Sequence, residues 1–367
     1  MREYLARLQR RQEAWLLAVI LLVGVVLGIA APGFLTLANL VDLLETYSVQ
    51  SIMAMGLLVV LVSGGIDISF AATASVAQYV AAIAATQAGW PAPAAIGIGL
   101  ATGIALGCIN AALIHFVRIT SIIATIAMMS VSFSLLMYFS GGQSIYNLPD
   151  WWTDRIVFWQ TEAPNGDLTR LTLPIVAMAV AALVTWGLMT RTSIGRQLYT
   201  MGGNPEAARR IGANIGRLHF VAYGFLGLMA SVGGLLQAHR VGESVPNAMY
   251  NTELSVLSAA VLGGASLMGG IGTVPGVLLG IVLLAMLQNG LNLLGVSSYF
   301  FQIVIGLTIL ISTSITVLSA RKRRRRRVLD DGHGTGGPTP VAAGAGGIQG
   351  EPTIQGEPTI HGKPVHG

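Results

Sequence analysis

Long apolar segments, interrupted by short polar turns, follow one another along most of this chain. A helix needs about 20 apolar residues to cross the hydrocarbon core of a bilayer, and most of these segments approach that length. The pattern therefore predicts an all-α fold, a polytopic transmembrane helical bundle of about ten spans. The expected spans are residues 14–31, 48–62, 70–88, 94–116, 121–139, 171–189, 218–238, 252–262, 275–294 and 297–318.

The edges of the first, second and eighth spans are not sharp, so nine or eleven spans remain alternatives. A short amphipathic stretch from Leu35 to Thr46 is expected to precede the second span. Gly99, Gly103 and Gly107 recur at four-residue spacing in the fourth span. Small residues at this spacing let helix backbones approach each other closely in lipid, so this ridge is predicted to be a packing face.

Composition agrees with a membrane protein. Hydrophobic residues make up 53% of the 367 residues, and charged residues only 10%, whereas a soluble domain carries about 25% charged residues. Cys108 is the single cysteine, which excludes a disulfide framework. No phosphate-binding loop and no set of catalytic or metal-ligating residues is recognisable, so we expect no catalytic residue, no metal, no cofactor and no nucleic-acid partner.

The basic residues are distributed unevenly between the two sides that ten spans would create. One side carries most of them: residues 1–13, Arg118, the segment 190–217 and the run 321–327. The other side carries Arg155, Arg170 and Arg240. Cytoplasmic loops are rich in Lys and Arg, so both termini are predicted to be cytoplasmic.

Three regions follow from this orientation. Residues 1–13 form a basic cytoplasmic N-terminus, and residues 14–320 form the transmembrane domain, whose loop 141–170 lies on the side opposite to the cytoplasm. Residues 321–367 form a basic and then disordered cytoplasmic tail, because the repeated Gly, Pro and Thr residues contain too little apolar surface to fold.

The loop 190–217 contains five arginines and a single acidic residue, Glu206. Asn204 is suited to cap a helix and Pro205 to occupy its first position. A short helix is therefore expected from Pro205 to Ile211, ended by Gly212. This element is interpreted either as a solvated, positively charged loop or as a docking helix for a soluble partner.

Polar side chains within the spans are costly in lipid and therefore informative. Asp67, preceded by Gly64 and Gly65, either caps the third span or forms part of a gate or hinge. Amides also occur in or near the spans, and each either hydrogen-bonds between helices or contacts a neutral, hydroxylated solute. The residues predicted for a gate or translocation path are Gly64, Gly65, Asp67, Asn110, Gln288, Asn289 and Asn292.

Four motifs, in order, are similar to those of the permease subunit of ribose-type ABC importers for monosaccharides. They are VSGGIDIS from Val62, IIATIAMMS from Ile122, GRQLYTMGGNPEAARRIGAN from Gly195 and LGGASLMGGIGTVPGVLLG from Leu262. The resemblance implies a translocation path for a ribose-type sugar or polyol in the bacterial inner membrane. It also implies a second permease chain, identical or different, a periplasmic sugar-binding protein and a cytoplasmic ATPase subunit.

In that family the loop matching Gly195 to Asn214 docks on the ATPase, which binds ATP and Mg²⁺ and hydrolyses ATP in place of this chain. The resemblance therefore assigns ATPase coupling to Gly195, Arg196, Gly202, Asn204, Pro205, Glu206, Ala207, Ala208, Arg209 and Gly212. A branched-chain amino-acid ABC permease, a stand-alone secondary transporter and a membrane scaffold or receptor remain alternatives at this point. Ile68, Phe70 and Ala71 differ from the family pattern, which weakens any assignment of a particular sugar.

Overall fold

A computed structural model describes residues 2–162, 168–297, 299–303, 306–307 and 310. The final span, 297–318, therefore falls mostly outside the described residues, and the tail 321–367 falls outside them entirely. The elements are α1 (Arg2–Ala30), α2 (Leu37–Ser63), α3 (Phe70–Thr86), α4 (Ala92–Ala112), the π-helix η1 (Leu113–Val117), α5 (Ser121–Ser140), α6 (Asp150–Thr153), β1 (Val157–Glu162), β2 (Leu168–Thr172), α7 (Leu173–Arg191), α8 (Ser193–Gly203), α9 (Pro205–Arg210), α10 (Ile215–Val241), α11 (Thr252–Leu262) and α12 (Val274–Leu293).

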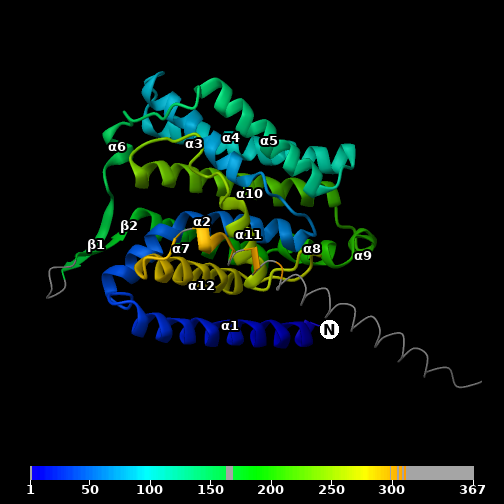
Figure 1. The fold of residues 1–367 in the computed structure, drawn as a ribbon. Helices are drawn as coiled ribbons and strands as arrows, with labels where there is room; N and C mark the ends of the chain where they lie inside the picture. Colours follow the sequence, from blue (N-terminus) through cyan, green and yellow to red (C-terminus); the bar gives the residue numbers. More distant parts are fainter. Residues whose placement is uncertain (1, 163–167, 298, 304–305, 308–309, 311–367) are drawn as a thin grey trace, which may run out of the picture. The chain divides into compact units, whose positions relative to one another are not determined.

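Helix α2 lies at the centre of the described bundle (Figure 1). It contacts α10 on one side and α12 on the other, α1 lies beyond α12, and α4 lies beyond α10. Every residue of α2 from Tyr47 to Ser63 except Gln50 is buried. A helix that is apolar all round is buried on all sides, and the sequence from Ile52 to Val62 has that composition.

The peripheral helices carry exposed apolar side chains. Leu22 in α1 is 64% exposed, Phe139 in α5 80% and Leu183 in α7 66%. Soluble proteins seldom present contiguous apolar surface of this kind to water, whereas lipid accommodates it. The exposed faces of α1, α5 and α7 are therefore lipid-facing or partner-facing surfaces, in agreement with the prediction of a polytopic helical protein.

Seven helices among the described residues are long and apolar enough to cross a membrane. Helices α3 and α11 are apolar but have only 17 and 11 residues. These two helices correspond to the expected third and eighth spans, and the glycine-containing breaks beside them explain their length. A count of ten spans is therefore not confirmed.

The second span begins earlier than residue 48. Most of the amphipathic stretch from Leu35 to Thr46 belongs to α2, which continues from Leu37 to Ser63 without a break. No Gly or Pro interrupts this stretch before Gly56, and the Thr36 hydroxyl caps its start by accepting a hydrogen bond from the Asn39 amide at 3.3 Å. The loop 141–170 also contains secondary structure of its own.

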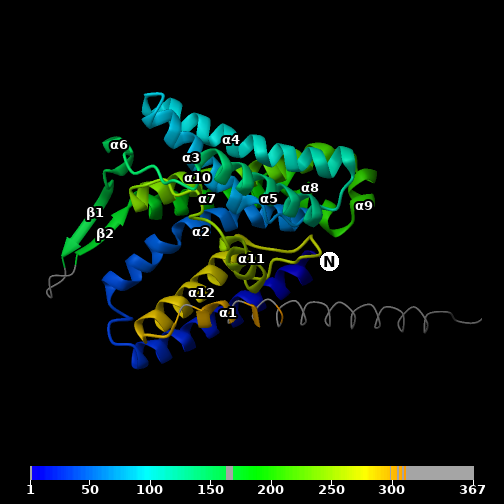
Figure 2. The same ribbon diagram turned by 45° about the horizontal axis from the view of Figure 1, so that its top comes forward.

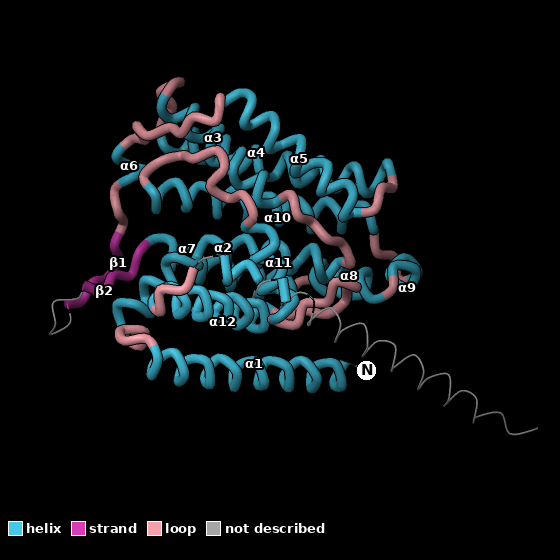
Figure 3. The backbone as a smooth tube through the Cα atoms, in the orientation of Figure 1, coloured by secondary structure: helices cyan, strands magenta, loops and turns pink. Residues whose placement is uncertain are grey.

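This loop contains the antiparallel hairpin β1–β2 (Figure 3). Residues such as Val157, Phe158 and Thr161 favour extended structure, which the all-α expectation did not consider for a polar loop. The loop is attached to α10, since the Trp152 indole donates to the Leu235 carbonyl at 3.1 Å. The hairpin and the helices α8 and α9 lie at opposite ends of the described bundle (Figure 2).

The predicted glycine ridge of α4 is confirmed as a packing face. Gly103 and Gly107 lie against Gly227 and Tyr223 of α10 so closely that no side chain fits between the helices. A Cβ atom at Gly103 would lie 2.6 Å from the Cβ of Ser231, and one at Gly107 would lie 2.9 Å from the carbonyl carbon of Tyr223. Both distances are shorter than real Cβ contacts.

This packing predicts that Gly103→Val destabilises the protein by about 1–3 kcal/mol, the usual cost of overpacking a close-packed interior. Gly97→Val is the matched control on the same helix, because no described atom lies within 4 Å of a Cβ at Gly97. Unfolding of the purified protein in mixed detergent micelles measures the difference. Equal stability of the two variants would contradict the close α4–α10 approach.

Candidate functional site

The arginine-rich loop 190–217 folds into two helices, α8 and α9. The Asn204 side chain caps α9 by accepting a hydrogen bond from the Ala207 amide at 3.1 Å, and Pro205 is its first residue. Gly212 follows the helix with a φ of +79°. The predicted helix and its boundaries are thus confirmed to within one residue.

Helix α8 was not expected from the sequence. Its signal is Thr192, whose hydroxyl accepts a hydrogen bond from the Gly195 amide at 3.0 Å. Thr before a helical run is a common N-cap. Leu198 and Met201 are buried on one face of α8 while Arg196 is exposed, so α8 is an amphipathic helix that lies on the bundle.

The residues predicted to couple to an ATPase differ in exposure. Asn204, Pro205, Glu206, Arg209 and Gly212 are exposed, as is Arg196. Ala207 and Gly202 are half-buried, and Ala208 and Gly195 are buried. Within α9, Ala208 faces the bundle and the charged side chains face away from it. Glu206 and Arg209 approach each other at 3.7 Å, but both are largely exposed, so this ion pair contributes little to stability.

The end of α8 lies against the end of α2. A Cβ atom at Gly64 would lie 3.3 Å from the Cα atom of Gly202. Gly64 belongs to the predicted gate and Gly202 to the predicted coupling loop, and the structure brings these two sets into direct backbone contact.

Asp67 lies in the break between α2 and α3 and is 2% exposed. Its carboxylate accepts hydrogen bonds from the amide and the hydroxyl of Ser69, both at 2.7 Å, and from the Asn110 amide at 3.1 Å. The same Asn110 amide also donates to the Ser69 hydroxyl at 2.7 Å. A buried carboxylate needs such donors to offset the loss of water.

The interpretation of Asp67 as the N-cap of the third span is wrong. Ser69 is the residue before α3, and Asp67 lies two residues further away. Its carboxylate instead joins this break to α4 through Asn110. The start of α5 also holds the break, because the Ser121 hydroxyl accepts a hydrogen bond from the Ile66 amide at 3.1 Å.

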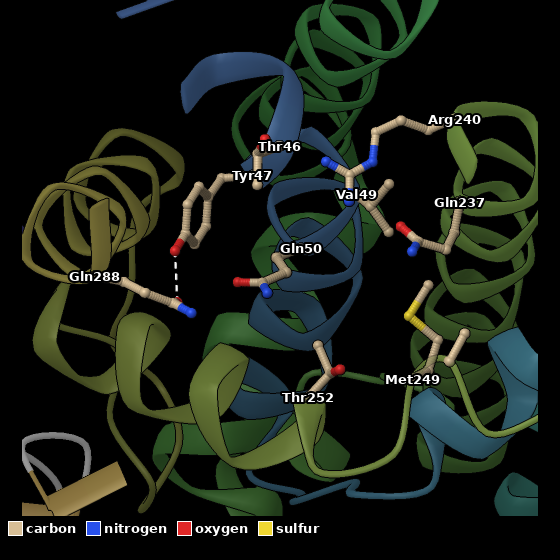
Figure 4. A pocket seen from close by; sticks show the side chains of 10 residues that line it. Thr46, Tyr47, Val49, Gln50, Gln237, Arg240, Met249, Thr252 and Gln288 are labelled. Carbon is tan, nitrogen blue, oxygen red and sulfur yellow. Dashed lines mark hydrogen bonds between the residues drawn. The ribbon is translucent and has the colours of Figure 1, made fainter. Parts of the chain in front are cut away.

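A polar cavity of about 140 Å³ lies at the other end of α2, between α2, α10, α11 and α12 (Figure 4). The side chains of Gln50, Gln237 and Gln288 converge on it in this view. Tyr47 donates a hydrogen bond to the Gln288 side-chain oxygen at 2.5 Å. The lining residues are Thr46, Tyr47, Val49, Gln50, Gln237, Arg240, Ala248, Met249, Thr252 and Gln288.

The predicted gate residues therefore fall into separate places. Gly64, Gly65, Asp67 and Asn110 lie at the end of α2 near α8, whereas Gln288 lines the cavity. Tyr47 and Ser63 are about 24 Å apart along α2 at 1.5 Å per residue. Asn289 forms a reciprocal pair of 3.1 Å hydrogen bonds with Asn39 and so joins α12 to α2. Asn292 is exposed.

Several cavity residues were not predicted as part of the gate, among them Gln50 and Tyr47. Gln237 belongs to the amides in or near the spans that the sequence offers for contact with a neutral, hydroxylated solute. Gln50 is the one residue between Tyr47 and Ser63 that is not buried. An amide close to the apolar stretch from Ile52 to Val62 is a signal that the sequence offered, but the sequence could not show which face of α2 it occupies.

The family model described as branched-chain amino acid transport system / permease component matches residues 39–313. The chain belongs to this permease family. The ribose import permease protein RbsC of Escherichia coli K12 is 33% identical over 316 residues, which cover 86% of this chain and 96% of that protein. RbsC of Bacillus subtilis is 33% identical over 82% of this chain and 89% of its own.

The galactose/methyl galactoside import permease protein MglC of Escherichia coli K12 is 30% identical, over 85% of this chain and 96% of that protein. These similarities and the apolar helices identify this permease as a multi-pass protein of the bacterial inner membrane.

The hydrogen bonds around Asp67 predict an energetic coupling between Asp67 and Asn110 in this permease. A double-mutant cycle of Asp67→Ala and Asn110→Ala is expected to give an interaction energy of about 0.5–3 kcal/mol, measured by unfolding in mixed micelles. Thr102→Ala on the same helix is the control partner, because the Thr102 hydroxyl donates within α4 to Ile98. Additive effects for Asp67 and Asn110 would contradict the contact.

Proposed function

We propose that this permease is the membrane-spanning subunit of an ATP-driven importer that moves a monosaccharide or polyol into a bacterial cell. The observation that carries the proposal is its similarity, over more than four-fifths of its length, to import permeases named for ribose and galactose. The family description mentions branched-chain amino acids, but the relatives reported above are named for sugars.

The partners follow from this role. A permease component forms a transport system with other components, and the proposed components are a periplasmic sugar-binding protein, a cytoplasmic ATPase subunit and a second permease chain. ATP and Mg²⁺ bind to the ATPase, which carries out hydrolysis, and this chain requires no cofactor of its own. With the proposed orientation, in which both termini are cytoplasmic, α8 and α9 are the proposed ATPase side and the hairpin is the proposed binding-protein side.

The docking element for the ATPase is α9. Three features support this assignment: its charged face points away from the bundle, its start is fixed by the Asn204 cap, and Ala208 anchors it from below. The solvated-loop interpretation does not require such a fixed geometry, whereas a docking surface does. Pre-organised surfaces bind more tightly because less conformational entropy is lost on association.

The cavity is the proposed contact for the sugar within this subunit. Amide and hydroxyl groups can donate to and accept from sugar hydroxyls, and the lining residues that the structure describes supply three amides, two threonine hydroxyls and a tyrosine hydroxyl. They include Arg240 but no carboxylate. A zwitterionic amino acid would need a counter-charge for its ammonium group as well, so the cavity favours a neutral hydroxylated solute.

Docking is tested by charge reversal at Glu206. Glu206→Arg is expected to weaken retention of the ATPase by about tenfold or more, equivalent to about 1.4 kcal/mol, in co-purification of the complex in detergent. The control is Glu162→Arg, the same change of charge at an exposed carboxylate of β1 at the opposite end of the bundle. Equal loss of the ATPase in both variants, or in neither, would remove the support for docking at α9.

Sugar contact is tested by Gln237→Leu, which keeps the approximate size of the side chain and removes its hydrogen-bonding groups. One such hydrogen bond is worth about 0.5–1.5 kcal/mol, so uptake of ribose or galactose by the reconstituted importer at subsaturating sugar should fall about 2–12-fold. Gln87→Leu, the same change at an exposed amide after α3 and outside the cavity, is the control and should leave uptake unchanged. An equal or larger effect at Gln87 than at Gln237 would contradict the assignment of the cavity.

A further inference from the structure

Three chain segments that are far apart in the sequence meet through their glycines: the end of α2, the end of α8 and the α11–α12 connection. Gly64 ends α2, Gly202 lies near the end of α8, and Gly269 and Gly270 belong to the connection between α11 and α12. We refer to these four residues as the glycine junction. A Cβ atom at Gly202 would lie 2.6 Å from the Gly270 nitrogen, and one at Gly269 would lie 2.7 Å from both the Gly64 Cα atom and the Gly202 oxygen.

No side chain fits into these contacts. Gly64, Gly269 and Gly270 also have φ values of +91°, +84° and +73°, a region that residues with a Cβ atom rarely occupy. Gly202 has ordinary backbone geometry and is restricted by space alone. A Cβ atom at Gly202 would lie even closer to the Val62 carbonyl oxygen than to the Gly270 nitrogen.

Hydrogen bonds tie the same three segments together. The Gly270 amide donates to the Val62 carbonyl at the end of α2, at 2.9 Å. The Tyr199 hydroxyl of α8 donates to the Gly272 carbonyl at 2.7 Å. Burial raises the pKa of Tyr199 to about 12, so the hydroxyl remains protonated and can donate throughout the physiological pH range. The end of α8 is thus packed between α2 and the α11–α12 connection, and it is hydrogen-bonded to that connection through Tyr199.

Helix α9 is connected to the end of α8 through a single residue. Asn204 lies between α8 and α9, its amide donates to the Thr200 carbonyl at 2.9 Å, and its side chain caps α9. The Ala213 amide then donates to the Ala208 carbonyl at 3.0 Å. A displacement of α9 is therefore transmitted to the end of α8, because little flexible chain separates the two helices.

The junction leads directly to the break between α2 and α3. Gly65 follows Gly64 and lies against Tyr223 of α10, and Asp67 is bonded to Asn110 of α4. Close-packed interiors shift between discrete arrangements and do not deform smoothly. A movement of α8 would thus displace α2 and the α11–α12 connection, and through Asp67 it would also act on α4.

We infer that the glycine junction is the point at which movement of the ATPase enters the transmembrane helices, and that Gly202 is its positioning residue. This inference rests on the proposed docking of the ATPase at α9. It assigns to Gly202 a role that differs from binding. The absence of a side chain at Gly202 lets α8 pack between the end of α2 and the α11–α12 connection, so that a displacement of α9 is transmitted to the transmembrane helices.

The test compares Gly202→Ala with Gly203→Ala in the complete importer, reconstituted with its ATPase and sugar-binding protein. Gly203 is the neighbouring glycine, it is exposed, and no described atom lies within 4 Å of a Cβ placed there. The measured quantities are the amount of ATPase retained and the amount of sugar transported per ATP hydrolysed. Couplings between sites typically correspond to factors of about 5–150.

Gly202→Ala is expected to retain the ATPase at the wild-type level and to lower the sugar transported per ATP by about fivefold or more. Gly203→Ala is expected to match the wild type in both measurements. A wild-type ratio of sugar to ATP in Gly202→Ala would overturn the inference while leaving docking at α9 intact. Loss of the ATPase from Gly202→Ala alone would also overturn it, because Gly202 would then act in binding or folding.

Tyr199→Phe provides the answer if Gly202→Ala cannot be purified. This change removes the hydroxyl that bonds to Gly272 and leaves the ring in place. The sugar transported per ATP should fall while the ATPase is retained, and an unchanged ratio would overturn the inference. If the wild-type chain itself retained no ATPase, the proposed function would fail, and that result is distinct from every outcome above.

Discussion

The arrangement of this bundle depends on direct backbone contact between helices at glycine. Gly103 and Gly107 of α4 meet Gly227 and Tyr223 of α10 with no room for a side chain, and the glycine junction repeats the same principle with three segments. In lipid, helix association gains little from the hydrophobic effect and depends on van der Waals contact and interhelical hydrogen bonds. Close approach of two helices increases their van der Waals contact and permits hydrogen bonds between them.

A gradient of burial follows from this packing. Helix α2 lies at the centre and is buried along most of its length, while α1, α5 and α7 present apolar side chains outward. Three polar pairs within the bundle join different elements: Asn39 with Asn289, Tyr47 with Gln288, and Asp67 with Asn110. Each pair joins elements distant in sequence, so polar contacts define the register of helices whose apolar surfaces alone would slide.

The two ends of α2 have different characters, and this difference agrees with the proposed division of labour. At one end, glycines and the Asp67 cluster hold α2 against α8 and α4. At the other end, amides and hydroxyls surround a cavity of about 140 Å³. The buried part of α2 between Tyr47 and Ser63, about 24 Å long, connects the proposed ATPase-side contacts with the proposed sugar contact.

The sequence by itself determined the membrane-embedded helical class, the close-packing ridge of α4 and the start of α9, since each is a local pattern: apolar length, four-residue glycine spacing, and Asn-Pro at a helix start. It did not reveal α8 or the hairpin, whose signals are short, and it left the span count open because glycine-rich breaks shorten α3 and α11. Only the tertiary structure decided that Gly64, Gly202 and Gly269 share one junction and that Gln288 lies far from Asp67. Such proximity depends on how distant segments pack, and in a single sequence no local preference encodes which glycine will face which.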